Sequence, residues 1–207
     1  EDNAAIINDA KNGEVYRNVL VGRSFEANKW ASLVLPFSMN ELKFQEVFGD
    51  KAICIHFTDV DLSTNTVNLT HHYYNMIVAG RPVFVRPSQN VSAQTIYDLT
   101  LQAGDVIPTL TNDGGIKFTG SIGKATMPKN SLFMSGNAIK HTTEPKSVNA
   151  MRAWIEGGEV LEDIDCPVAK NIETLGQIYA EKLRKSLTHL IRRETEAIGR
   201  KRGRPIL

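Results

Sequence analysis

The stretch 30–49 constrains the fold more than any other part of the chain. It opens with an apolar run, 30–35, in which three large aliphatic residues, Leu33 to Leu35, follow one another. Such a run is typical of a strand that is buried on both faces in the middle of a sheet. Pro36 has no N–H to donate to a sheet ladder, so we expect the strand to end there.

A short helix is predicted directly after this strand, over 39–48. Ser38 and Glu41 have the Ser-x-x-Glu spacing of a capping box, in which the serine side chain accepts a hydrogen bond from the Glu41 N–H. Gly49 stands where a left-handed C-terminal cap is needed. We further expect one buried cluster of large apolar residues at strand ends, formed by Trp30, Leu33, Leu35, Phe37, Phe48, Phe84 and Trp154.

The remainder of the sequence consists of short apolar or alternating runs separated by turn residues. The run Asn112-Asp113-Gly114-Gly115 is a hairpin signal of this kind. Short strands at such spacing predict an all-β, mainly antiparallel fold, a β-sandwich with one short helix after the first core strand and a C-terminal helix. The predicted strands cover 14–25, 30–35, 52–57, 68–74, 77–87, 93–101, 116–120, 131–134 and 151–155.

The charge distribution divides the chain into an acidic body and a basic tail. The formal net charge is only +1, but nine of the 24 Lys and Arg residues lie between Lys182 and Arg204. We therefore expect a flexible lead-in at 1–13, a β-sandwich domain at 14–166 and a basic amphipathic helical tail at 167–207. The apolar stripe of that helix begins after Asn171, a suitable N-cap, and ends before Gly199.

The 207 residues are 42% hydrophobic and 23% charged, as in an ordinary globular protein. No apolar run approaches the roughly 20 residues of a membrane span. Cys54 lies in an apolar run and is expected to be a buried small hydrophobe, while Cys166 lies in an acidic loop. The two cysteines leave a disulfide open. The chain begins at Glu1, so either a leader has been removed or the chain is a piece of a longer protein.

Five motifs occur in an order that resembles a β-sandwich module found near the C-termini of large secreted or surface proteins of the Bacteroidetes group. The resemblance covers about 14–156 and implies an extracellular or cell-surface location, with no activity assigned to the motif residues. Met151 departs from the pattern, in which an aromatic residue opens the last motif. The motifs are Trp30 with Leu35-Pro36-Phe37, Phe48-Gly49, Ala79-Gly80-x-Pro82 running to Arg86-Pro87, Phe118-x-Gly120, and Arg152-Ala153-Trp154.

Motifs for catalysis, metals and cofactors are missing from the sequence. It contains no Gly-x-Ser-x-Gly, His-Glu-x-x-His or paired-cysteine motif, and its five histidines are scattered. The segment 120–125 has some features of a phosphate loop, but its spacing is too short, so we interpret it as a hairpin loop. The sequence therefore predicts a non-catalytic protein without cofactor or metal.

The leading functional hypothesis is a spacer, adhesion or weak glycan-binding element whose partner is a carbohydrate or another surface protein. An aromatic platform for a sugar needs exposed rings, and the candidates are Tyr73, Tyr74 and Tyr97. One alternative is a glycan-active hydrolase or an accessory domain of one. A hydrolase requires two carboxyl groups about 5–10 Å apart in a cleft.

A second alternative is a DNA-associated protein. The tail contains Arg-Gly-Arg-Pro, which resembles the AT-hook that binds the narrow minor groove of A·T-rich DNA. Six residues are a weak motif, so we do not expect nucleic acid to be the partner. The residues that would carry this alternative are Arg200, Lys201, Arg202 and Arg204.

Overall fold

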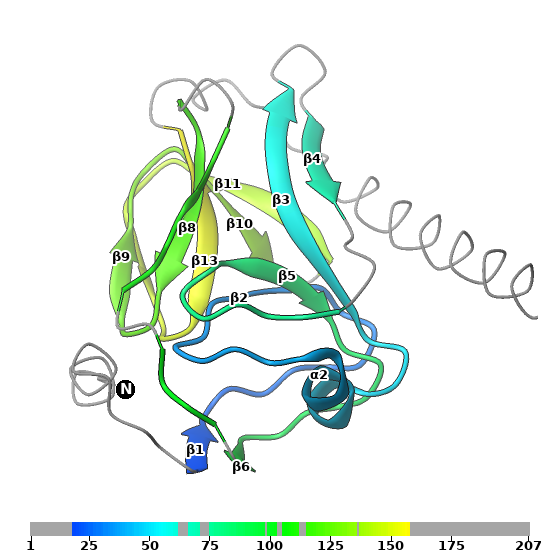
Figure 1. The fold of residues 1–207 in the computed structure, drawn as a ribbon. Coiled ribbons are helices and arrows are strands. Elements are labelled where there is room, and N and C mark those ends of the chain that lie inside the picture. The colour runs from blue at the N-terminus through cyan, green and yellow to red at the C-terminus, as the bar shows by residue number, and fades with distance from the viewer. Residues whose placement is uncertain are drawn as a thin grey trace, which may run out of the picture. The chain divides into compact units, whose positions relative to one another are not determined.

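The computed structural model describes residues 18–61, 66–70, 75–97, 99–102, 105–111, 115–135 and 137–157. All of them belong to Glu1–Lys170, the first of two units into which the chain divides. These ranges contain thirteen strands and one short helix, and all the strand pairs are antiparallel (Figure 1). The prediction of an all-β, mainly antiparallel fold with one short helix is confirmed. The predicted lead-in and helical tail lie outside the described residues.

Two larger sheets and two strand pairs make up the fold. The five-stranded sheet has the order β11 (Ala138–Thr142), β10 (Ser131–Ser135), β13 (Arg152–Glu156), β8 (Lys117–Ser121) and β7 (Thr109–Leu110). The four-stranded sheet has the order β2 (Ala31–Leu33), β5 (Val83–Arg86), β3 (Ile53–Asp61) and β4 (Thr66–Thr70). The pairs are β1 (Asn18–Val21) with β6 (Gln94–Tyr97), and β9 (Ala125–Met127) with β12 (Lys146–Val148).

The two larger sheets contact each other through aromatic side chains. Phe118 on β8 stacks on Phe84 of β5, with ring centroids 4.6 Å apart, and lies 5.7 Å from Phe57 of β3. At the β2 end of this contact, the Ala153 N–H donates to the Ser32 hydroxyl at 3.3 Å. Phe57 and Phe84 on one face of the four-stranded sheet therefore contact β8 of the five-stranded sheet.

The opposite face of the same sheet packs on the helix. Val83 and Val85 flank Phe84 on β5, and they belong to a buried cluster with Phe44 and Phe48 of helix α2 (Glu41–Phe48). Successive side chains of a strand point to opposite faces, which places Phe84 against the other sheet. The expected single cluster is therefore wrong. Its seven members are all buried, but Trp30, Phe84 and Trp154 lie outside the cluster around α2.

Strand β2 is buried on both faces as predicted, but it is an edge strand and not a central one. Its free edge is covered by a side chain in place of a further strand. The Arg23 Nη1 donates to the Ser32 carbonyl oxygen at 2.6 Å, so a group that would otherwise lack a partner is satisfied. An apolar run in the sequence indicates that the side chains are buried, but it does not indicate whether the strand lies in the middle or at the edge of its sheet.

Helix α2 begins two residues later than a capping box at Ser38 would place it. Its N-cap is Asn40, whose side-chain oxygen accepts from the Lys43 N–H at 2.9 Å. The Ser38 hydroxyl instead accepts a hydrogen bond from the Ala79 N–H at 3.1 Å, and it donates one to the Gln102 Oε1 at 2.6 Å. Gly49 ends the helix at φ 98°, ψ 156°, a positive φ as expected but outside the left-handed helical region that was predicted.

The strand pairing is consistent with one predicted turn and contradicts another. Strands β7 and β8 pair on either side of the predicted Asn-Asp-Gly-Gly turn, of which 112–114 lie outside the described residues, and β3 pairs with β4. The segment 120–125 is not a hairpin loop, because β8 pairs with β7 and β13 whereas β9 pairs with β12. Gly120 is required there for another reason: a Cβ would lie 2.3 Å from the Arg152 carbonyl oxygen.

Candidate functional site

Of the three predicted glycan-binding tyrosines, the structure describes one, Tyr97. Tyr97 is the last residue of β6 and is 58% exposed, as a sugar platform requires. Tyr73 and Tyr74 lie outside the described residues, as do the four basic residues of the tail and Cys166. Cys54 is a free cysteine, and it is buried as predicted.

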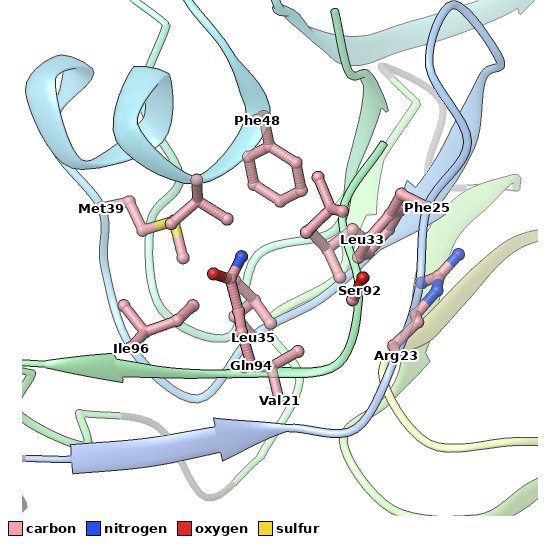
Figure 2. A pocket seen from close by; sticks show the side chains of 12 residues that line it. Val21, Arg23, Phe25, Leu33, Leu35, Met39, Phe48, Ser92, Gln94 and Ile96 are labelled. Carbon is pink, nitrogen blue, oxygen red and sulfur yellow. The ribbon is translucent and has the colours of Figure 1, made fainter. Parts of the chain in front are cut away.

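A small enclosed hollow lies between helix α2 and the strands below it (Figure 2). The side chains of Leu35, Met39 and Phe48 point toward one another across it, and Arg23 lies at its margin beside Phe25. Its volume is about 10 Å³, at the lower limit for one water molecule. This hollow is a packing gap in the core and offers no room for a ligand.

An open cleft of about 560 Å³ lies next to Arg23. We call it the arginine cleft. Its lining comes from three parts of the chain that are far apart in the sequence: the segment after β1, the segment before β6, and the start of β13. The lining residues are Arg23, Ser24, Phe25, Glu26, Lys29, Trp30, Ala31, Asn90, Val91, Ser92 and Arg152.

A tight turn forms one wall of the arginine cleft. Asn28 has a φ of 61°, which asparagine tolerates better than most residues, and its N–H donates to the Pro87 carbonyl oxygen at 2.8 Å. The Asn90 side-chain oxygen accepts from the Ala27 N–H at 2.8 Å. Phe25 and Val91, which also line the cleft, exchange two backbone hydrogen bonds of 2.8 Å. Hydrogen bonds therefore hold this turn to the segment 87–91.

Arg23 forms the floor and ties the segments together. It is 9% exposed, and its Nη1 donates to the carbonyl oxygens of Ser32 and Met151, each at 2.6 Å. Its guanidinium carbon lies 4.6 Å from the centre of the Phe25 ring. Within the described structure, the Arg23 Nε and the Trp30 Nε1 are buried donors without a hydrogen-bond partner.

The charges at the cleft are unbalanced. No carboxylate among the described residues forms an ion pair with Arg23 or Arg152, and the one acidic residue of the lining, Glu26, pairs with Lys29. Burial, and then the like charge of Arg152, lower the pKa of the Arg23 guanidinium well below its ordinary value. Burial also lowers the pKa of Arg152, which is half-buried. Both shifts reflect positive charge held out of water without a counter-charge.

Two other hollows are less suited to bind a ligand through charge. One, of about 180 Å³, shares Arg152 with the arginine cleft and is lined partly by Met127, Phe133 and Trp154. The other, of about 400 Å³, lies at the C-terminal end of α2 and includes Glu46 and Asp50. Glu46 forms an ion pair with Lys43 at 2.8 Å, so one of these two carboxylates already has a partner.

The sequence carried one overlooked signal for this site. Val19, Val21, Arg23 and Phe25 occupy alternate positions and are all buried, so the arginine stands in the apolar phase of the pattern. A charged residue at one of these buried positions predicts a buried cation that bonds to other groups of the protein. Arg152 had no such signal, because in the Arg-Ala-Trp motif it is an ordinary polar residue at the start of a strand.

The residues that the structure describes include no group of three or more His, Cys, Asp or Glu arranged to hold a metal ion. They also include no helix with the length and apolar character to cross a lipid bilayer. Comparisons with protein-family models, curated protein sequences and solved structures found no match for this chain.

Proposed function

We propose that this protein is a non-catalytic β-sandwich module of a secreted or cell-surface protein, in which it serves as a spacer, an adhesion element or a weak glycan-binding element. The proposed sandwich rests on the aromatic contact between Phe84 and Phe118, which joins inward faces of the two larger sheets. The motif order that resembles the Bacteroidetes module supports the proposed extracellular location.

The observation that carries the binding part of the proposal is the composition of the arginine cleft. It is open, large enough for a small ligand, and lined by hydroxyl, amide and charged side chains. Hydrolysis of a glycosidic bond needs two carboxyl groups on either side of that bond. The cleft lining has one, Glu26, and it is already paired with Lys29. The cleft is therefore better suited to bind a saccharide than to cleave it.

A glycan array with the full chain tests this function. We expect binding to at least one class of glycan, and several-fold weaker binding after Tyr97→Ala if its exposed ring forms part of the platform. Tyr97→Phe is the matched control, because it keeps the ring and removes only the hydroxyl. The same comparison applies to Tyr73→Ala and Tyr74→Ala. If the wild-type chain bound no glycan, the binding part of the proposal would be wrong.

A further inference from the structure

We propose that the arginine cleft binds the carboxylate of an acidic saccharide, a sugar of the uronic acid class. The inference rests on the proposed glycan-binding function and names the ligand and the site. The observation behind it is the meeting of Arg23 and Arg152 at one open cleft, where no described carboxylate pairs with either of them.

The first argument concerns charge. Two guanidinium groups close enough to affect each other repel, and partial burial strengthens that repulsion because water screens it less. An oxyanion placed between such groups removes the repulsion and gains charge-assisted hydrogen bonds. Arg152 is the contact group, since it is half-buried and lines the open cleft. Arg23 acts from the floor through its charge, because its Nε is covered.

The second argument concerns size and lining. A carboxylate alone would leave most of a cleft of about 560 Å³ empty, whereas ligand sites of 300–1,000 Å³ are usual for small molecules. The remaining lining includes Ser24, Ser92 and the Asn90 amide, which suit the hydroxyl groups of a sugar ring. The Asn90 side-chain oxygen is already used by the Ala27 N–H, so its NH₂ is the group that remains to donate.

The third argument concerns preorganisation. The Arg23 guanidinium is fixed by two hydrogen bonds of 2.6 Å to the Ser32 and Met151 carbonyl oxygens. Met151 has a φ of 59° and directly precedes Arg152, so the same contact holds the backbone that presents the second arginine. A site in which one cation and the backbone of the other are held in place before binding loses less entropy when the ligand arrives.

Titration of the full chain, followed by amide chemical shifts, tests the inference. The probes are glucuronic acid, glucose as its neutral match, and acetate and sulfate as simple anions, all at one ionic strength. We expect glucuronic acid to bind at least about tenfold more tightly than glucose or acetate, with shifts at Ser24, Asn90 and Arg152. We expect Arg152→Gln to weaken the binding of glucuronic acid about tenfold, as loss of a charge-assisted pair should.

Lys51→Gln is the control, because Lys51 lines the hollow at the end of α2 and not the arginine cleft. It should leave the affinity unchanged. Equal affinity for glucose and glucuronic acid, or no effect of Arg152→Gln, would overturn the inference. Equal affinity for acetate or sulfate would overturn its saccharide part. Binding of acidic glycans on the array that Arg152→Gln leaves unchanged would contradict this site and leave the proposed glycan-binding function standing.

Discussion

Arg23 occupies a position that the alternation of its segment assigns to apolar side chains. The cost of burying its charge is offset by two carbonyl oxygens and the face of the Phe25 ring, and no carboxylate contributes among the described residues. One guanidinium therefore covers the edge of β2, fixes the start of β13 and supplies positive potential to the cleft. A buried charge that performs three tasks cannot be exchanged for an apolar residue without loss of at least one of them.

Cys54 gives a prediction at the same scale. Burial raises the pKa of its thiol, so the folded chain keeps this proton at a pH where the unfolded chain loses it. The thiol contributes stability that is fully present below pH about 8.5 and is lost as the pH rises. We expect the free energy of unfolding to fall above that pH, by up to about 1.4 kcal/mol per pH unit from this group.

Denaturant unfolding of the wild type and of Cys54→Ala between pH 7 and 10 measures this contribution. The variant is expected to be less stable overall, because a buried side chain is shortened, but to lose less stability as the pH rises. Parallel curves for the two proteins would show that the thiol ionises alike in the folded and unfolded states.

At the scale of elements, the start of α2 shows which of two suitable residues, Ser38 and Asn40, caps the helix. Asn40 accepts from Lys43, whereas Ser38 holds the Ala79 segment. We expect Asn40→Ala to lower the free energy of unfolding by about 1 kcal/mol and to speed hydrogen exchange at the Lys43 amide. Ser38→Ala is the control, and it should speed exchange at Ala79. Faster exchange at Glu41 after Ser38→Ala would restore the capping box.

The elements that could be predicted are those whose apolar pattern is set by local burial. The runs 131–134 and 151–155 correspond to β10 and β13 within one residue, and the run 52–57 covers the first part of β3, which continues to Asp61. The short strands β7, β9, β11 and β12 were missed, because each has few apolar residues and is defined by its partner. The edge position of β2 was also hidden, since a side chain from outside the sheet covers it.

At the scale of the whole molecule, the candidate site comes from topology. Arg23 and Met151 are 128 positions apart in the sequence, and they meet because β13 lies at the centre of its sheet beside the edge of β2. No local pattern encodes that meeting. Exposed aromatic residues could be chosen from the sequence, but the pairing of two arginines in one cleft required the fold.

Saturation-transfer NMR on an oligosaccharide of glucuronic acid mixed with the full chain tests most directly whether the protein binds an acidic saccharide without cleaving it. We expect transfer to the uronic acid ring, loss of that transfer with Arg152→Gln, and no new reducing-end signals after a day of incubation, because the cleft lining holds only one carboxylate, Glu26, and that is paired. Reducing-end signals that grew in proportion to the protein, or transfer that Arg152→Gln left unchanged, would contradict a non-catalytic site built on the two arginines.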